Sequence, residues 1–459
     1  MDKENFIKEN DKIATALKKI SGSFGKIICV TDNYKKLLGV ITAGDIRRAI
    51  LSGNDPNQSI KKIYNKNVSF IFDTELKNKK FIKSNFYNRE INQSIFYMPV
   101  VDKKKRVKNI LTTERIIELM ENKNFKKLKK KLPKVLIVGG AGYIGSILCN
   151  KLLKKNYSVK IVDKVLYDKN VINNFKKNKN FSFDKADICD LNTQINVIRD
   201  IDVVVFLAEI VGDPACNARP EDALKTNYLS LSSMAQLCSY LGISKFIYTS
   251  SCSVYGLDKH NRLLTEKSNL NPISHYARMK IMSEKALLAN KNDIFKPTIF
   301  RLGTVFGPSL RNRFDLVVNT MAKNAYYNKK INLHGGEQWR PNIHVEDVAD
   351  GIIASIKSNQ KIVGNKIFNL SSDNSNFKIK DIAFGAKKIF KKAKIDVQKS
   401  MVDARNYRVS SKKFFISSGF RAKKTIGQAY KDFEKLFRKN KNFNPNRKIF
   451  SNIKVLGDK

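Results

Sequence analysis

From residue 134 onward, the chain alternates short apolar runs with longer stretches of helical spacing. The run KVLIV at 134–138 fits a buried strand, and the apolar positions of 143–155 recur at the three-and-four spacing of a helix. Further apolar runs of strand length lie at 158–164, 181–188, 202–209, 245–251 and 297–303. Repeated strand–helix units predict an α/β fold with a doubly wound parallel sheet.

The first part of the chain, up to about residue 120, contains a faint internal repeat with an offset of 70 residues. The segment 27–42 aligns with 96–112, so that Asp32 and Asp102 fall at equivalent positions. Each copy has the pattern of a strand, a polar turn, a second strand and a helix. Two such units usually stack, because each covers an apolar face of the other.

A glycine-rich turn joins the strand at the start of the α/β region to its helix. In GGAGYIG, Gly139 permits a tight turn, Gly142 lets backbone N–H groups approach a pyrophosphate, and Gly145 allows close packing of the helix. The next strand ends in Asp163, where a carboxylate can hold the ribose hydroxyls of a dinucleotide. A carboxylate repels a 2′-phosphate, so NAD is the expected cofactor, while the adjacent Lys164 leaves NADP as an alternative.

Tyr276 and Lys280 are spaced to lie on the same face of a predicted helix. Because a tyrosine has an unperturbed pKa of about 10, a nearby positive charge is needed to stabilise its phenolate as a base near neutral pH. Lys280 can supply that charge. Ser251, at the end of a predicted strand, can hydrogen-bond the same substrate hydroxyl. We therefore expect these three residues to be catalytic.

Composition and charge exclude several other classes of protein. The 459 residues include 87 Lys and Arg against 41 Asp and Glu, a formal net charge of +46. These basic residues are spread along the whole chain instead of clustering with aromatics, so we do not expect nucleic-acid binding. No apolar run reaches the length of a membrane span, and the polar N-terminus does not resemble a signal peptide.

The six cysteines are scattered and form no C-x-x-C pair. They indicate neither a metal site nor a disulfide framework. We therefore expect a cytoplasmic protein without a bound metal.

The segment GVITAGDIRRAI at 39–50 resembles the nucleotide-binding signature of cystathionine-β-synthase (CBS) domains. Together with the repeat, it identifies residues 1–122 as a tandem CBS pair of α+β fold. The resemblance implies that Thr42 and Asp45 contact the phosphate and ribose of an adenine nucleotide. Arg115 stands where the second copy should have its acidic residue, so at most one site is expected. The alternative is a pair that only mediates dimerisation or docking.

The order of motifs after residue 134 resembles the extended short-chain dehydrogenase/reductase family of nucleotide-sugar epimerases and dehydratases. These motifs are GGAGYIG at 139–145, TSSCSVYG at 249–256, the Tyr276/Lys280 pair and WRPNIHVEDVADG at 339–351. The resemblance implies a Rossmann-type domain at 134–437, with a smaller substrate-binding region at 304–420. The lysine-rich segment 123–133 is expected to be a linker, and 438–459 a basic tail.

This resemblance also implies a set of site residues. The expected cofactor-binding residues are Gly139, Gly142, Tyr143, Ile144, Gly145, Asp163, Asp187, Ile188, Ala208 and Lys280. The expected substrate-binding residues are Ser251, Tyr276, Thr304, Arg340 and Arg405, for a nucleoside-diphosphate sugar. Arginine suits this role because its guanidinium group binds phosphate in bidentate fashion. Relatives form homodimers through helices that correspond to 221–241 and 274–290, so a homodimer is expected.

In this family, the two residues after the catalytic serine help to divide the reactions. Here they are Cys252 and Ser253, so the acidic pair of the 4,6-dehydratases is absent, and the cysteine stands one position earlier than in the 3,5-epimerases. The pattern resembles UDP-galactose 4-epimerase, and we expect C4 epimerisation through a 4-keto sugar. The alternatives are a 4-ketoreductase or dehydrogenase, a 3,5-epimerase-reductase, and a sensor without catalysis. His344 is expected to be structural.

Overall fold

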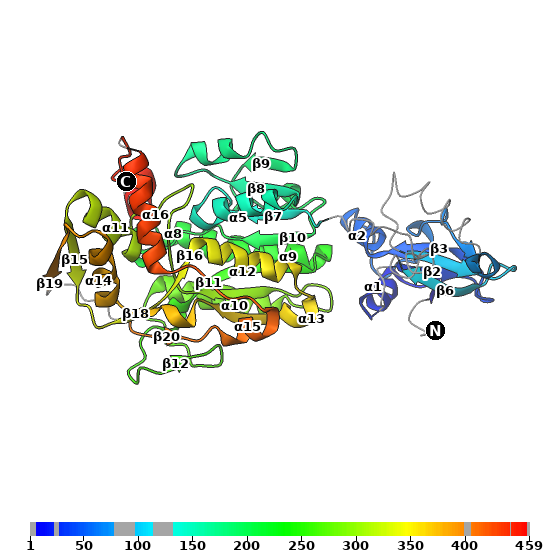
Figure 1. Cartoon of the computed structure of the whole chain (residues 1–459). Coiled ribbons are helices and arrows are strands. Elements are labelled where there is room, and N and C mark those ends of the chain that lie inside the picture. Colours follow the sequence, from blue (N-terminus) through cyan, green and yellow to red (C-terminus); the bar gives the residue numbers. More distant parts are fainter. Residues whose placement is uncertain are drawn as a thin grey trace. The chain divides into compact units, whose positions relative to one another are not determined.

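The structure is a computed structural model that describes residues 6–22, 27–77, 97–112, 132–398, 405–440 and 442–456. The chain divides into two compact units, Met1–Lys130 and Lys131–Lys459 (Figure 1). Most of the expected linker at 123–133, and Arg115, lie outside the described residues.

The first unit contains two small sheets with the strand orders β1-β2-β3 and β4-β5-β6. Its elements are β1 (Phe6–Lys8), α1 (Ile13–Gly22), β2 (Ile27–Thr31), β3 (Leu37–Thr42), α2 (Ala43–Leu51), η2 (Ile60–Lys62), β4 (Ile71–Phe72), η3 (Asp73–Lys77), β5 (Tyr97–Val101) and β6 (Val107–Thr112). In both sheets the first pair of strands is parallel and the second pair antiparallel.

The internal repeat is confirmed residue by residue. Ile27 pairs with Thr42 in the first copy, and Tyr97 pairs with Thr112 in the second, so the offset of 70 is kept in both strands. The turns are also equivalent. Asp32 accepts backbone N–H bonds from residues 34 and 36, and Asp102 accepts them from residues 104 and 106.

The two copies meet through a symmetric pair of backbone hydrogen bonds. The Leu37 N–H donates to the Lys105 carbonyl at 2.9 Å, and the Val107 N–H donates to the Lys35 carbonyl at 3.0 Å. Leu37 and Val107 are equivalent under the offset of 70, and so are Lys35 and Lys105, so each bond is the counterpart of the other. The copies are therefore related by an approximate two-fold axis. A shared apolar cluster that includes Cys29 and Val101 lies across the same seam, as expected for stacked repeats.

The second unit is built on a seven-stranded parallel sheet of order β17-β13-β11-β10-β7-β8-β9. Its strands are β7 (Val135–Val138), β8 (Val159–Asp163), β9 (Phe181–Lys185), β10 (Val203–Phe206), β11 (Lys245–Ser251), β13 (Thr298–Leu302) and β17 (Lys366–Leu370). The predicted doubly wound sheet is confirmed. The prediction omitted β17 and extended β9 and β10 by three residues into the loops that follow them.

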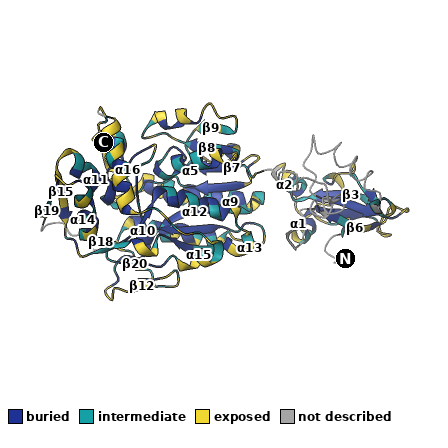
Figure 2. Cartoon of the chain, in the orientation of Figure 1, coloured by how far each residue is buried: buried dark blue, intermediate teal, exposed yellow. Residues whose placement is uncertain are grey.

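Helices cover both faces of this sheet, whose strands form the buried centre of the unit (Figures 1 and 2). One face packs against α5 (Tyr143–Lys154), α12 (Val345–Lys357) and α15 (Lys412–Ser418). The other face packs against α6 (Leu191–Val197), α9 (Ser230–Leu241) and α10 (His275–Ala289). Alternate residues of β7 supply the two faces, because strand side chains point to opposite sides in turn.

The strand order reverses between β7 and β10, so the loops after these two strands diverge to opposite faces and open a crevice at this switch point. Gly139 follows β7 with a φ of +83°, and a Cβ at this position would lie 2.6 Å from the backbone nitrogen of Ala208. A glycine is therefore required both by the backbone conformation and by the approach of the second loop.

A smaller lobe adjoins the sheet, and its core extends beyond the expected range of 304–420 to include residues 426–439. Its core joins α11 (Val317–Tyr327), β15 (Lys330–His334), α14 (Ile379–Ile389), β19 (Lys394–Gln398) and α16 (Ile426–Lys439). Short strands connect it to the sheet domain: β14 (Thr304–Phe306), β16 (Trp339–His344) and β18 (Asn376–Lys378) form one sheet, and β12 (Leu263–Leu264) pairs with β20 (Arg408–Val409).

The segment after residue 438, expected to be a basic tail, is folded over residues 442–456. It carries η8 (Lys448–Phe450) and α17 (Asn452–Leu456). Phe450 is buried in the aromatic core of the lobe beside Phe314. The Asn452 N–H donates to Asp315 at 3.0 Å, and the Arg219 side chain donates to the Leu456 carbonyl at 2.6 Å. This segment is therefore part of the domain.

Within the described residues, no helix combines the length and the apolarity that crossing a membrane requires. The same residues contain no group of three or more His, Cys, Asp or Glu side chains placed to hold a metal ion.

We predict that Gly139→Ala lowers the free energy of unfolding by about 2–4 kcal/mol, the combined cost of a left-handed alanine and of the overlap with Ala208. Gly419→Ala is the matched control, because Gly419 also has a positive φ, of +72°, but no atom lies within 4 Å of its Cβ position. Its cost should be about 1–2 kcal/mol. Equal losses for both variants in denaturant unfolding would contradict the close approach.

Candidate active site

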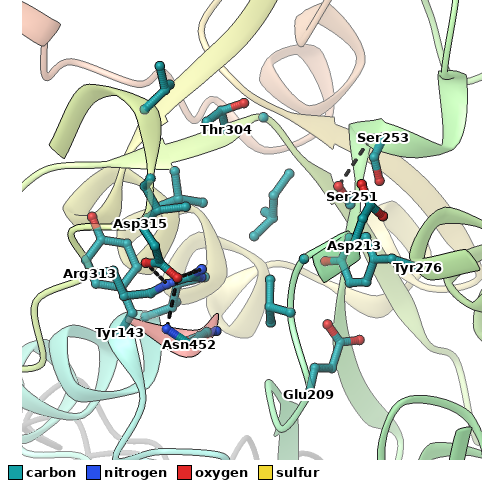
Figure 3. Close-up of a pocket in the computed structure, with 18 of the residues that line it drawn as sticks. Tyr143, Glu209, Asp213, Ser251, Ser253, Tyr276, Thr304, Arg313, Asp315 and Asn452 are labelled. Atoms are coloured by element: carbon teal, nitrogen blue, oxygen red, sulfur yellow. Dashed lines mark hydrogen bonds and ion pairs between the residues drawn. The ribbon is translucent and has the colours of Figure 1, made fainter. Parts of the chain in front are cut away.

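A cavity of about 680 Å³ opens at the switch point of the sheet. Its wall is formed by the glycine turn after β7, the loop after β10, the end of β11, one face of α10 and residues of the smaller lobe (Figure 3). Ligands of doubly wound sheets bind at this place, beyond the carboxyl ends of the strands.

The structure brings the expected catalytic residues to one cavity. Ser251, Tyr276 and Lys280 all contribute to its wall. Ser251 ends β11, and its hydroxyl oxygen accepts the N–H of Ser253 at 3.1 Å. The Ser274 hydroxyl accepts the N–H of Ala277 and caps the N-terminus of α10, so the helix begins one residue before Tyr276.

Lys280 has a partner that the sequence analysis missed. Its ammonium group forms an ion pair with Glu209 and donates to the Thr249 carbonyl at 2.5 Å. The other carboxylate oxygen of Glu209 accepts the hydroxyl of Tyr248 at 2.8 Å. Both charged side chains are almost fully buried, so each depends on the other for its charge to persist.

Burial and this ion pair act together on Tyr276. The Lys280 ammonium lies 5.5 Å from the centre of the Tyr276 ring. Nevertheless, burial raises the pKa of Tyr276 well above 10, and the negative charge of Glu209 raises that pKa further. Burial also lowers the pKa of Lys280, and Glu209 opposes this effect. In the protein alone, Tyr276 therefore holds its proton at neutral pH.

A buried amide side chain helps to anchor the loop that carries Glu209. Asn227, within η5 (Lys225–Leu229), accepts the N–H of Ile210 at 2.8 Å and donates to the Ile210 carbonyl at 2.9 Å. The hydroxyl of Ser283, on α10, donates to the Asn227 carbonyl at 2.9 Å. The loop after β10 and the helix of Tyr276 are thus held through the same residue.

The expected cofactor residues fall into two groups. Gly139, Gly142, Tyr143, Ile144 and Gly145 line the cavity. Among the described residues, the lining does not include Asp163, Asp187, Ile188 or Ala208.

The second group is held by contacts of its own. The Asp163 carboxylate accepts the N–H groups of Ala141 at 2.9 Å and Val165 at 2.7 Å, which ties β8 to the glycine turn. Asp187 forms an ion pair with Lys164 at 2.6 Å, and Ile188 packs in the core. The pairing gives Lys164 a role other than binding a 2′-phosphate.

The glycine turn fits the pyrophosphate of a dinucleotide. Gly142 is the N-cap of α5 and has no side chain to cover the helix end, so this end can be approached by an anion. A Cβ at Gly145 would lie 2.6 Å from the Gly139 carbonyl oxygen, so the helix start packs closely on the turn. The Tyr143 side chain is turned away to the lobe, where its hydroxyl donates to the Gly307 carbonyl at 2.5 Å.

Basic side chains surround the lobe side of the cavity. Arg340 and Arg405, both expected to bind substrate, line it together with Thr304. Arg340 donates to the Arg405 carbonyl, and Arg405 lies 3.4 Å from the Asp213 carboxylate. The two arginines are therefore coupled to each other and to the loop after β10.

Two further arginines that the sequence makes candidates for holding a diphosphate, Arg311 and Arg313, also line the cavity. Arg311 stacks on the ring of Tyr167 at 3.8 Å and donates to Asn452 of α17 at 2.7 Å. Burial and the neighbouring Arg313 lower the pKa of Arg311 to about 10. Arg313 is paired with Asp315 at 3.0 Å.

His344 is structural, as expected. It is fully buried, and its Nδ1 accepts the N–H of Glu346 at 3.1 Å as the N-cap of α12. Burial lowers its pKa to about 4, so the imidazole is neutral near pH 7.

In the first unit, Thr42 and Asp45 form a capping box at the start of α2. The Thr42 hydroxyl donates to the Asp45 carboxylate at 2.7 Å, and Arg48 pairs with the other carboxylate oxygen at 2.5 Å. The two expected nucleotide-contacting residues are thus adjacent and hold each other in place.

Comparisons with known proteins agree with this geometry. Residues 135–371 match the NAD dependent epimerase/dehydratase family, and residues 1–52 match the CBS domain. A dTDP-D-glucose 4,6-dehydratase of Dictyostelium discoideum is 28% identical over 261 residues, covering 53% of this chain and 59% of the relative. An uncharacterized UDP-glucose epimerase of Bacillus subtilis is 30% identical over 234 residues, covering 48% of this chain and 72% of the relative.

The solved UDP-glucuronic acid 4-epimerase of Bacillus cereus, in complex with UDP-glucuronic acid and NAD, superimposes with a TM-score of 0.60. It is 25% identical, and the match covers 66% of this chain and 99% of that structure. Epimerases and dehydratases both occur among the relatives, so the family alone does not specify the reaction. Because the family match spans more than half of the residues, the chain belongs to the NAD dependent epimerase/dehydratase family, with a CBS domain at its N-terminus.

Proposed function

We propose that this protein is an NAD-dependent nucleotide-sugar epimerase that inverts the sugar at C4 through a 4-keto intermediate. One observation carries the proposal: Ser251, Tyr276 and Lys280 share a cavity with a glycine turn that fits a dinucleotide pyrophosphate. When bound, NAD would accept a hydride from C4 of the sugar and return it.

The residues of the chain would move the proton. Tyr276 removes the proton of the C4 hydroxyl and later gives it back, while Ser251 donates a hydrogen bond to the same oxygen. Lys280 stabilises the phenolate in this interval because its ammonium group faces the tyrosine ring. Arg340 and Arg405 would hold the diphosphate, so that the hexose alone can turn.

The position of Cys252 argues against the 3,5-epimerase alternative. Its thiol is fully buried and donates to the Arg301 carbonyl at 3.3 Å, and burial raises its pKa far above the usual range. A thiol held in this way is a poor base. Ser253, the next residue, lines the cavity instead.

We also propose that the protein forms a homodimer through the helices around α9 and α10. Large apolar side chains are exposed on this part of the surface, including Leu224, Leu229 and Met282, each more than 40% exposed. Exposed apolar side chains on neighbouring helices are typical of a subunit interface.

The proposed reaction is tested by incubating the protein with UDP-, GDP- and dTDP-hexoses in deuterated water and identifying the products by NMR. Inversion at C4 without deuterium uptake supports the proposal. Deuterium at C3 or C5, loss of water, or net consumption of NADH would assign a different reaction on the same scaffold.

We predict that Tyr276→Phe lowers the rate of epimerisation at least about 100-fold, because the base is lost, while NAD remains bound. The control is Tyr34→Phe, since Tyr34 lies in the first unit and is 82% exposed. NMR of the products gives the rate, and calorimetry with NAD gives the affinity. Unchanged turnover in Tyr276→Phe would remove the mechanism.

A second prediction concerns pH. Because Tyr276 must lose a proton to act as a base and its pKa is raised, activity should increase as the pH rises from neutral to alkaline. In Glu209→Gln the buried Lys280 loses the partner that keeps it charged, so the phenolate of Tyr276 loses its stabilising cation and the acid limb of kcat/KM moves to higher pH by about one unit or more. Glu221→Gln, an exposed control, should leave the profile in place.

We further propose that the first CBS copy binds an adenine nucleotide at Thr42 and Asp45. The support is the family match and the adjacency of the hydroxyl and the carboxylate at the start of α2. Binding requires that Asp45 exchange a bond to Thr42 or Arg48 for the ribose hydroxyls. The alternative is that the capping box is the whole role of these two residues.

We predict that the full chain binds ATP, ADP or AMP in calorimetry, and that Asp45→Asn weakens the affinity at least about 10-fold, the usual cost of a lost charged hydrogen bond. Asp55→Asn, at an exposed position of the same unit, is the control and should bind normally. If none of the three nucleotides gives a heat of binding, the nucleotide proposal is wrong, and the alternative of a pair that only mediates assembly is favoured.

A further inference from the structure

Two polar atoms on the catalytic side of the cavity are buried and lack a hydrogen-bond partner in the described part of the chain: Asp213 Oδ1 and Ser253 Oγ. Ser253 is only 3% exposed. Buried polar atoms are nearly always paired, because leaving one unpaired costs free energy. Both residues belong to the cavity wall, so a ligand in the cavity can satisfy them.

The two atoms are close to the proposed base. Figure 3 shows Asp213, Ser251 and Ser253 on the same side of the cavity as Tyr276. The charge of Asp213 contributes to the raised pKa of Tyr276, which requires the carboxylate to be near the phenol. A sugar held with its C4 hydroxyl at Tyr276 would therefore present neighbouring substituents to Asp213 and Ser253.

The Asp213 side chain is held in its position from several directions. The preceding Gly212 has a φ of +98°, and Pro214 follows at the start of α7 (Asp213–Ala218). The Oδ2 atom lies 3.4 Å from the guanidinium group of Arg405. The anchoring of the loop by Asn227 adds to this fixation. Oδ1 is consequently the oxygen available to the sugar.

The chemistry of these atoms selects the kind of sugar. A carboxylate oxygen only accepts hydrogen bonds, and a serine hydroxyl both donates and accepts. A hydroxymethyl group or ring hydroxyl can donate to Asp213 and exchange a hydrogen bond with Ser253. The carboxylate of a hexuronate cannot donate a hydrogen bond, and it would bring a second negative charge against Asp213.

Two cations near this part of the cavity could favour a uronate. Arg313 acts on the pKa of Tyr276, but it is already paired with Asp315. Arg405 is the cation next to Asp213. Its interaction with Asp213 partly compensates its positive charge, and under the proposed function it also serves the diphosphate. A uronate bound to Arg405 would compete with the Asp213 carboxylate for this guanidinium group and would place a second anion beside it. The charges around Asp213 therefore favour the binding of an uncharged sugar over that of a hexuronate.

We propose that Asp213 and Ser253 form a sugar subsite that accepts a neutral, hydroxyl-bearing hexose and excludes hexuronates. This specificity rests on the proposed function as a nucleotide-sugar enzyme. It would separate this protein from the similar Bacillus cereus structure, which is in complex with UDP-glucuronic acid.

The test compares the binding of UDP-glucose and UDP-glucuronic acid, which differ only at C6, to the NAD-loaded full chain by calorimetry. We expect the wild-type protein to bind UDP-glucose at least about 10-fold more tightly. Asp213→Asn keeps the shape but removes the charge, so this ratio should fall at least about 5-fold. Asp222→Asn, an exposed carboxylate on α8 (Pro220–Leu224), is the matched control and should keep the wild-type ratio.

Equal or tighter binding of UDP-glucuronic acid by the wild-type protein would overturn the subsite, as would a ratio that Asp213→Asn leaves unchanged. A Ser253→Ala variant gives an independent measurement, and we expect it to bind UDP-glucose at least about 3-fold more weakly. Turnover is followed in parallel by NMR. The expected binding selectivity without any product would contradict the epimerase assignment and leave the subsite standing, while failure of both ligands to bind would contradict both.

Discussion

The buried ion pair between Lys280 and Glu209 is the interaction on which the catalytic side of the cavity depends. It joins α10 to the loop after β10, and Tyr248 of β11 completes it with a hydroxyl bond. A buried lysine would lose its charge without a partner, and a buried glutamate would gain a proton. The pair preserves both charges at the cost of leaving little net positive charge beside Tyr276. Under the proposed function, a positive charge on the bound cofactor would add to the stabilisation of the phenolate.

Much of the sheet could be predicted because its signal is local. Each strand is a short apolar run next to a helical stretch, and β7 is followed by glycines whose spacing is characteristic. The strand β17 was missed because KIFNL is brief and lies in a polar stretch. Most of the smaller lobe was predicted only as a region, since its helices and short strands are joined by contacts distant in sequence.

Some residues of the candidate site could also be predicted from local sequence patterns, and others could not. Tyr276 and Lys280 could be predicted because they have helical spacing, and Ser251 because it lies at the end of a predicted strand. Glu209 and Asp213 are single acidic residues in a loop, a pattern too common to indicate a role. A buried lysine implies a buried anion somewhere, but the sequence does not say which carboxylate folds against it. Asn452 is still harder to predict, because α17 lies near the end of the chain and its contact with Arg311 spans 141 residues of sequence.

The seam between the two N-terminal copies has a consequence for how such a pair can change over generations. The bonds that cross it join main-chain atoms of Lys35, Leu37, Lys105 and Val107, so no particular side chain is needed to keep them. Substitutions can therefore accumulate in one copy without breaking these bonds, provided that the apolar cluster across the seam is kept. A duplicated hairpin of this kind can carry a recognisable signature in one half, as residues 1–52 do, while the bonds across the seam tolerate different side chains in the other half.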